Sequence, residues 1–304
     1  MSTSEPPDRR SAGILAISVA TVVWGMAGLF VKSASVSALW FSTYRLWTGV
    51  AIYAVVLVVT RRRLRLATVR ACAIGGVLFA ADQAFAYSAF KLTTVANANI
   101  IIALAPIVIA FVASRRFGER FGRREVLLAG ISFVGVTLVA IGASGSPAWS
   151  LTGDLLALCS MGCWAAYWLY SKRVRQQVST MEYMSSVMLV GALVMTPVPF
   201  LVDRSLVLPS TQDWIWIVTA ALFTGALAHT LVAWAHHHVE AWLGSLITQC
   251  MPVVAGIAAW IALDEPLTPL VALGGVITVV ATATLAGGSG VFRRFGSMIR
   301  GWRW

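Results

Sequence analysis

The sequence predicts an all-α integral membrane protein with ten transmembrane helices, and three observations carry this prediction. The chain has 304 residues, of which 59% are hydrophobic and only 12% are charged, whereas soluble domains carry about 25% charged residues. The apolar residues gather into ten blocks, each about 20 residues long, the length that a helix needs to cross a bilayer. The basic residues fall between these blocks and favour one side of the membrane.

The ten apolar blocks are separated by short stretches rich in Arg, Gly, Pro, Ser and Asp, which are typical of loops. No window alternates apolar and polar residues for long, which argues against a β-barrel. The first block is too long for a signal-peptide core, so we expect no cleavage. We expect spans at roughly 12–32, 38–60, 69–90, 93–113, 124–143, 152–171, 181–202, 213–235, 240–262 and 267–287.

Positive charge gives the predicted orientation. With the N-terminus inside, nineteen of the 23 Lys and Arg residues fall on the inner side, Arg45 lies within a span, and three are outside, namely Lys32, Lys91 and Arg204. We therefore expect a multi-pass protein of the cell inner (plasma) membrane with both termini cytoplasmic, a disordered segment at 1–11 and a basic tail at 288–304. The net charge of +11 does not indicate a nucleic-acid partner, because the arginines form no continuous basic face.

The two halves of the chain resemble each other. Pro106 and Pro252 are 146 positions apart, and so are Glu119 and Glu265. Trp24 and Trp164 are 140 positions apart, and so are Lys32 and Lys172. Each half, 12–143 and 152–287, would hold five spans, so the second half would enter the membrane from the opposite side. Composition alone also makes apolar segments alike, but together with the span count the pairs favour two inverted five-helix repeats around a central cavity with alternating access.

Several short motifs lie in a characteristic order along almost the whole chain: "WGMAGLFVK" in the first span, Arg45 in the second, Pro106 in the fourth, and the "GER" and "DEP" turns. In this order and spacing the chain resembles the drug/metabolite transporter superfamily, EamA family. The resemblance implies a transporter, often an exporter of amino acids or other metabolites. The abundance of aromatic residues within the spans is similar to that of the aromatic amino acid exporters of the YddG type.

Asp82 and Gln83 form a polar pair near the middle of the third span. A carboxylate that faces lipid at this depth costs at least about 2.5–3.5 kcal/mol, so Asp82 should face a watery cavity or a partner. The two side chains are 100° apart on a helix, so one can face the cavity while the other faces a neighbouring helix. Asp82 could bind a substrate ammonium, carry a proton, or only bridge helices. His229, which the 146 offset aligns with Gln83, is either a titrating group or a helix-to-helix hydrogen bonder.

Aromatic residues are the second set of candidates for a substrate site. Trp24 and Trp164 lie at mid-span, whereas tryptophan normally collects at membrane interfaces. They either pack against lipid and helices or, with Tyr87, Tyr167 and Trp168, form an aromatic wall that suits flat side chains and attracts cations.

Polar residues and prolines complete the candidates. Arg45 could meet a substrate carboxylate or extend to the outer surface, and Tyr44 precedes it. Asn99 and Gln249 add neutral polar groups, and since Asn97 and Asn99 lie on different helix faces, at most one of these two faces the cavity. Pro106 and Pro252 should kink the fourth and ninth spans, which makes them hinge candidates.

Transport of a small organic solute is the predicted function, most consistent with an amino acid or similar amphiphilic metabolite. Neither a nucleotide-binding nor a metalloprotease motif is present, so we expect no cofactor and no metal; the adjacent histidines of "AHHHVE" (235–240) point apart. Besides substrate and lipid, protons are a potential partner through Asp82, and a facilitator is equally consistent. The alternatives are a membrane-embedded enzyme such as a hydrolase and a carrier of phosphorylated substrates.

Overall fold

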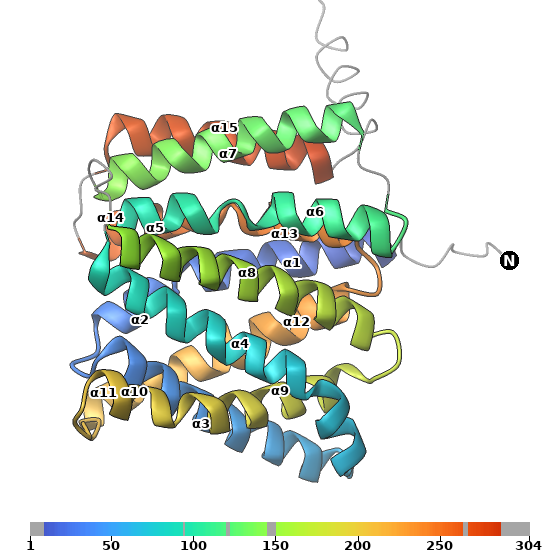
Figure 1. Ribbon diagram of the computed structural model, residues 1–304, viewed down its shortest axis with the longest axis vertical. Helices are drawn as coiled ribbons and strands as arrows, with labels where there is room; N and C mark the ends of the chain where they lie inside the picture. The colour runs from blue at the N-terminus through green and yellow to red at the C-terminus, as the bar shows by residue number, and fades with distance from the viewer. Residues whose placement is uncertain (1–8, 94, 120–121, 145–149, 264–266, 287–304) are drawn as a thin grey trace, which may run out of the picture.

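The computed structural model describes residues 9–93, 95–119, 122–144, 150–263 and 267–286, and within these ranges the regular structure is entirely helical (Figure 1). Glu265, most of the predicted N-terminal segment and the predicted tail at 288–304 lie outside the described residues. The helices are α1 (Arg9–Gly25), α2 (Ala27–Lys32), α3 (Ala38–Val59), α4 (Leu66–Leu92), α5 (Val95–Ile102), α6 (Ala105–Arg116), α7 (Arg123–Ser144), α8 (Leu151–Val174), α9 (Thr180–Met195), α10 (Pro197–Val202), α11 (Thr211–Ala220), the π-helix η1 (Ala221–Leu227), α12 (Ala228–Ala235), α13 (Ala241–Thr248), α14 (Met251–Leu263) and α15 (Pro269–Ala286).

These helices form ten crossings in the described part of the chain, one for each predicted block. Five crossings are single helices, and the others are broken into α1/α2, α5/α6, α9/α10, α11/η1/α12 and α13/α14. Nine of the ten are long and apolar enough to cross a membrane. The tenth, α8, has 24 residues but carries many aromatic and polar side chains, which lower its hydropathy. Figure 1 shows α8 midway between the two edges of the bundle, packed against α4, α5 and α6, so its polar side chains can face protein rather than lipid.

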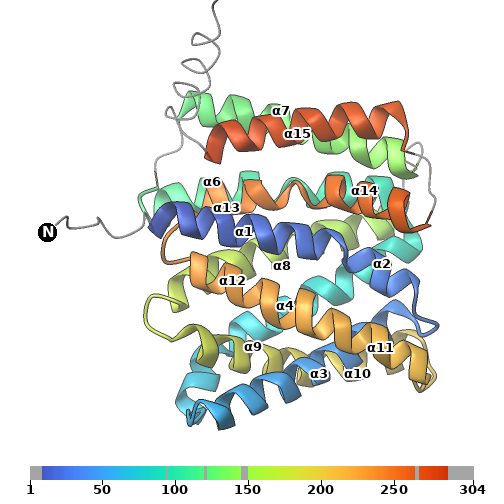
Figure 2. The same cartoon turned by 180° about the vertical axis from the view of Figure 1, so that it is seen from behind.

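The positions of the first and last described helices agree with an even number of crossings. The start of α1 and the end of α15 lie at the same end of the bundle (Figure 2), here called the proximal end; the other is the distal end. The helix α1 begins at Arg9, inside the segment predicted as disordered. Its first turn is held by the side chain of Arg10, which lies 3.3 Å from the Glu240 carboxylate.

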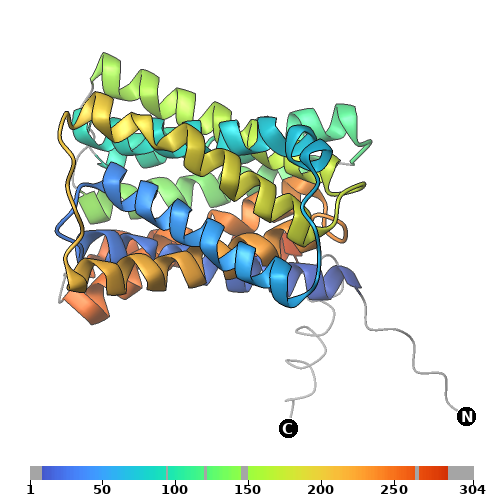
Figure 3. The same ribbon diagram turned by 90° about the horizontal axis from the view of Figure 1, so that it is seen from below.

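The two edges of the bundle have different partners. At one edge α7 packs along α15 (Figures 1 and 2), and their backbones approach closely: a Cβ atom on Gly135 would lie 2.7 Å from the carbonyl oxygen of Gly274. At the other edge α3, in mid-blue, lies between α9 and the α11–η1 segment (Figure 3). The remaining helices lie between these two edges, where the candidate functional site is found.

The fourth and ninth crossings break just before their prolines. The first halves, α5 and α13, end at Ile102 and Thr248, and the second halves begin with Pro106 and Pro252 as their second residues. Because proline lacks an N–H group and its ring clashes with the preceding turn, a helix is interrupted at this point. The predicted kinks are therefore present, while a hinge role for the two prolines stays a prediction.

Candidate functional site

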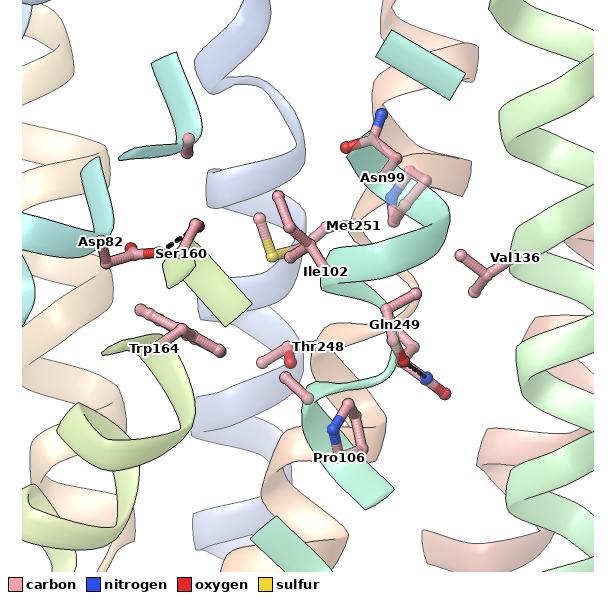
Figure 4. Close-up of a pocket in the computed structure, with 14 residues that line it drawn as sticks. Asp82, Asn99, Ile102, Pro106, Val136, Ser160, Trp164, Thr248, Gln249 and Met251 are labelled. Atoms are coloured by element: carbon pink, nitrogen blue, oxygen red, sulfur yellow. Dashed lines mark hydrogen bonds between the residues drawn. The ribbon is translucent and has the colours of Figure 1, made fainter. Parts of the chain in front are cut away.

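A cavity of about 280 Å³ lies within the bundle, where the two crossings that break before Pro106 and Pro252, α5/α6 and α13/α14, meet α4 and α8 (Figure 4). Residues on each side of both breaks contribute to its wall. Most of the wall is apolar, with a small number of polar groups, which is typical of small-molecule sites. The lining residues are Asp82, Ala86, Asn99, Ile102, Ala103, Ala105, Pro106, Val136, Ser160, Trp164, Thr248, Gln249, Met251 and Pro252.

Asp82 is the one charged side chain among these lining residues. Its Oδ1 atom accepts a hydrogen bond of 2.7 Å from the hydroxyl of Ser160 on α8, and the side chain is half-buried (Figure 4). No described Lys, Arg or His forms an ion pair with it. A carboxylate in an apolar wall with a single hydroxyl donor is incompletely satisfied, so it can take up a cation or a proton.

Gln249 connects the two broken crossings. Its Nε2 atom donates to the carbonyl oxygen of Ala103 at 2.9 Å, and its Oε1 atom accepts from the Ser132 hydroxyl of α7 at 2.9 Å. The Ala103 carbonyl lies at the break between α5 and α6. Asn99 also lines the cavity, whereas Asn97 is hydrogen-bonded to Asp154 of α8, so the two asparagines lie on different faces as the helical spacing predicts.

Gln83 and Arg45 form a second polar cluster on another face of α4. Arg45 Nη2 donates to Gln83 Oε1 at 2.7 Å, and the hydroxyl of Ser42 donates to the same oxygen. Arg45 is 9% exposed, so it does not extend to the surface. Neither residue is among those that line the cavity. The polar pair of α4 therefore faces two ways, with Asp82 towards the cavity and Gln83 towards α3.

His229 sits in an aromatic enclosure beside the cavity. Its ring centroid lies 4.7 Å from that of Trp24 and 4.8 Å from that of Phe79, and Tyr167 is 6.5 Å away. Trp24 is fixed by a 2.9 Å hydrogen bond from its indole N–H to the Thr224 carbonyl of η1. The structure thus places His229 in ring contacts rather than on the cavity wall.

Trp164 links this enclosure to the cavity. It lines the cavity, and its ring centroid lies 5.8 Å from that of Trp24 and 5.7 Å from those of Tyr167 and Trp168. The edge-to-face arrangement with Trp24 is a favourable aromatic geometry. Of the predicted aromatic wall, Trp164 alone is among the lining residues. Trp24, Tyr167 and Trp168 contact its ring but do not line the cavity.

Three candidates lie elsewhere. The Tyr44 hydroxyl donates to the Val207 carbonyl oxygen at 2.8 Å, at the distal end of the bundle. Trp168 is fully buried, and its indole N–H donates to the Ala241 carbonyl at 3.1 Å. Tyr87 is partly buried against the cluster of α3, α4 and α9 side chains. The structure does not bring these three to the cavity wall.

Sequence reasoning missed Ser160 and Thr248. Both line the cavity, and Ser160 holds the carboxylate of Asp82. Ser160 lies four residues before Trp164, which places the two on one face of α8. That spacing was the available signal, whereas nothing in the sequence distinguishes Thr248 from other threonines in the spans.

The distal end of α8 holds the connection between α4 and α5. Asp154 accepts a hydrogen bond of 2.9 Å from the Thr93 hydroxyl and a further one from the Asn97 amide. Asp154 lies in the first turn of α8, where the helix dipole favours a carboxylate. One end of this central helix therefore anchors the start of the fourth crossing.

The proximal end of α8 holds the connection between α12 and α13. Lys172 Nζ donates to Glu119 Oε1 at 2.6 Å and to the Val239 carbonyl at 2.8 Å. The Glu119 carboxylate also accepts from the backbone N–H of Ala241 at 2.9 Å, at the N-terminus of α13. The loop after α6, the end of α8 and the start of α13 are thus joined by one buried ion pair.

A mostly apolar cavity with a few polar groups, between broken helices in a bundle of which nine crossings are long and apolar enough to span a membrane, is typical of a membrane transporter. The EamA-like transporter family model matches residues 11–141 and 151–287. The chain therefore belongs to the EamA-like transporter family.

Similar proteins agree with this family. The chain is 24% identical over 264 residues to "Uncharacterized transporter YyaM" of Bacillus subtilis (strain 168), covering 84% of this chain and 85% of that one. It is 26% identical over 189 residues to "Uncharacterized transporter YdfC" of the same organism, covering 62% and 61%. A solved structure described as "Crystal structure of protein" superposes with a TM-score of 0.80 at 21% identity, covering 94% of this chain and 99% of that chain, which shows a shared fold.

Proposed function

We propose that this transporter exports an amino acid or a related small amphiphilic metabolite by alternating access through the central cavity. The single observation that carries the proposal is Asp82, a lone carboxylate in an otherwise uncharged wall. Asp82 binds the ammonium group of the substrate, because a buried carboxylate without a fixed cation gains most from one that the ligand supplies.

The cavity also offers a place for the substrate carboxylate. Ala105 begins α6 and Met251 begins α14, and both residues line the cavity. The N-terminus of a half-helix is the positive end of its dipole, which transporters with broken helices use to bind anionic substrate groups. At these two starts the N–H groups of Ile107 and Val253 already donate to the carbonyls of Leu104 and Cys250, so the dipole carries this part of the proposal. Asp82 and the half-helix starts together match the two charges of a zwitterion.

Size and aromatic content support a small solute. A volume of about 280 Å³ is just below the about 300–1,000 Å³ of pockets for drug-sized ligands. Trp164 presents a flat indole surface to this space, which suits an aromatic side chain. Phosphorylated substrates need cationic partners, and neither Lys nor Arg is found among the described lining residues.

The two halves act as inverted repeats in this proposal. Trp24 and Trp164, which the 140-residue offset pairs, are in ring contact at 5.8 Å, as expected for equivalent residues beside a pseudo-two-fold axis. The two ends of α8 hold the two loops that must separate in turn, one through Asp154 and the other through Lys172. We place the proximal end in the cytoplasm of a cell with the protein in its inner membrane, from the distribution of Arg and Lys.

The test is flux into liposomes that contain the purified protein, with radiolabelled amino acids chosen by a thermal-shift screen. We expect a chemically unchanged solute to cross, and Asp82→Asn to reduce its flux at least about tenfold through loss of charge pairing. The control Asp82→Glu keeps the carboxylate and should retain more of the flux than Asp82→Asn. Conversion of the solute without flux would favour an enzyme, and flux that Asp82→Asn leaves unchanged would refute the role of Asp82.

Proton coupling is tested in the same vesicles. An imposed pH gradient should drive accumulation of solute if Asp82 exchanges protons for substrate, and Asp82→Asn should remove this dependence. A facilitator would equilibrate the solute across the membrane without accumulation, whichever direction the pH gradient has.

A further inference from the structure

A basic groove lies at the proximal end of the bundle, far along α3 and α4 from the cavity lining. It has a volume of about 790 Å³ and is formed by the α3–α4 connection together with the α8–α9 connection. The lining residues are Arg62, Arg63, Leu64, Arg65, Thr68, Gln177, Val178 and Glu182. Three arginines from four consecutive positions thus converge on one open site.

The arginine charges in this groove are poorly compensated. Glu182 is the one acidic lining residue, and its carboxylate accepts a 2.6 Å hydrogen bond from the Ser179 hydroxyl. Arg62 reaches that same hydroxyl at 3.5 Å. In the described part of the chain, Arg63 and Arg65 form no ion pair with any carboxylate, so the groove keeps a net positive charge that attracts an anion.

The turn that leads from α3 into the groove begins at Arg61, which is exposed but is not among the lining residues. Arg61 has φ of 54° and terminates α3 by hydrogen bonds from Arg61 N to Val58 O and from Arg62 N to Leu57 O, the Schellman arrangement that usually has glycine at this position. A positive φ is strained for arginine. The chain therefore keeps a basic residue where glycine would fit the backbone better.

Apolar side chains flank the groove on the outside of the bundle. Val58, Val59 and Leu66 are 78%, 75% and 64% exposed, and they belong to α3 and α4 next to the connection that carries the arginines. These helices are long and apolar enough to cross a membrane, so we expect such side chains to contact lipid tails close to the headgroups. A ligand in the groove thus meets positive charge at one end and apolar surface at the other.

We propose that this groove binds the phosphate headgroup of an anionic phospholipid, with its acyl chains along Val58, Val59 and Leu66. Charge complementarity and the adjoining apolar surface both fit this amphiphile. Basic pockets between transmembrane helices are known to bind such headgroups. The site is separate from the transport cavity and independent of its substrate.

Native mass spectrometry of the full chain in detergent tests this proposal, with phosphatidylglycerol and phosphatidylcholine of matched acyl chains as probes. We expect preferential retention of phosphatidylglycerol. The double substitution Arg63→Gln/Arg65→Gln should weaken its binding roughly 30-fold, since each basic residue near the surface contributes about a factor of five. The matched control Arg123→Gln/Arg124→Gln removes the same charge from the exposed start of α7 and should change binding less than about threefold.

Three results would overturn the proposal: equal retention of the two lipids, equal weakening by the control pair, or full displacement of phosphatidylglycerol by millimolar inorganic phosphate, which would indicate a free-anion site. Circular dichroism and thermal melting of all variants verify that they fold. The substituted arginines are exposed, so the fold should be retained and the binding measurement can be read directly.

Discussion

Gln249 and Ala103 are joined by a hydrogen bond of 2.9 Å from the amide Nε2 to the backbone carbonyl, and they are 146 positions apart. This is the offset that relates the two halves in sequence. Thr278 and Ser132 keep the same separation, and the Thr278 hydroxyl lies 3.4 Å from the Ser132 carbonyl. Equivalent residues of two repeats meet only near the axis that relates them, so contacts at this separation are what the proposed inverted repeats predict.

The Gln249 side chain should be important for stability. Gln249→Leu removes the hydrogen bonds to the Ala103 carbonyl and the Ser132 hydroxyl and leaves Ser132 only its longer contact of 3.4 Å with the Thr282 hydroxyl. We expect a loss of about 1–3 kcal/mol in the free energy of unfolding, measured by thermal and denaturant unfolding in detergent. The control Gln176→Leu alters an exposed glutamine in the α8–α9 loop and should have little effect; equal losses in both variants would contradict the role of Gln249.

The ion pair of Lys172 and Glu119 should act as a coupled unit. Both side chains are nearly buried, at 12% and 8% exposed, so removing one partner leaves an uncompensated charge. We expect Lys172→Met and Glu119→Gln each to cost about 3 kcal/mol, and the double variant to cost clearly less than the sum. A double-mutant cycle by denaturant unfolding measures the coupling, and strict additivity would show that the pair is not coupled.

His236 predicts a loss of stability on acidification. It follows the last residue of α12, its Nδ1 atom shares a 3.0 Å hydrogen bond with Ser171, and its ring packs against Trp168. Burial, followed by the nearby charges of Lys172 and Arg175, holds the pKa of His236 well below its usual value. The imidazole is therefore neutral when folded, and its contribution to stability is present above the unfolded pKa of about 6.5 and is lost as the pH falls below it.

The variant His236→Asn checks this assignment, because asparagine keeps a polar atom near Nδ1 but does not titrate. We expect the decrease of melting temperature between pH 7 and pH 5 to be smaller in His236→Asn than in the original protein. Identical pH profiles would show that another group controls the acid sensitivity.

Two glycines of α7 give a matched test of helix packing. A Cβ atom on Gly135 would lie 2.4 Å from the Thr278 hydroxyl oxygen and 2.7 Å from the Gly274 carbonyl oxygen, whereas one on Gly130 meets nothing within 4 Å. We expect Gly135→Ala to separate α7 from α15 and destabilise the protein by about 1–3 kcal/mol. Gly130→Ala should be neutral or stabilising by up to about 1 kcal/mol, and unfolding in detergent compares the two. Similar stabilities would mean that α15 can shift without cost.

Much of the fold follows from hydropathy, because ten apolar blocks leave few ways to satisfy the backbone in lipid. The span limits agree with the helices to within a few residues at most ends. The breaks before Pro106 and Pro252 follow from the chemistry of proline. The break at Thr196 comes directly before Pro197, so it has the same cause, although it was not predicted. The π-helix and the break at Met26 were not predicted, because apolar segments without a proline or a polar insertion carry little signal about local helix type.

The candidate site was predictable only where a residue type is costly in lipid. Asp82 had to face a cavity or a partner, and it does both, whereas Gln83 and Arg45 satisfy each other away from the cavity. The aromatic candidates were harder to place, since tryptophan and tyrosine are stable in packing, at interfaces and in cavities alike. The direction of Trp168 and Tyr44 depends on helix rotation, which a single apolar sequence does not specify.

The π-helix η1 distinguishes the α11–α12 crossing from α4, which is α-helical along its whole length. The 146 offset aligns these two crossings. Between α11 and α12 the backbone bonds to the fifth residue instead of the fourth. Slipping that register by one residue would turn α12 by about 100° with its axis in place. Such a twist would carry His229 out of contact with Trp24 and Phe79, so the π-helix is the point of this crossing at which a change of register would reach the aromatic enclosure.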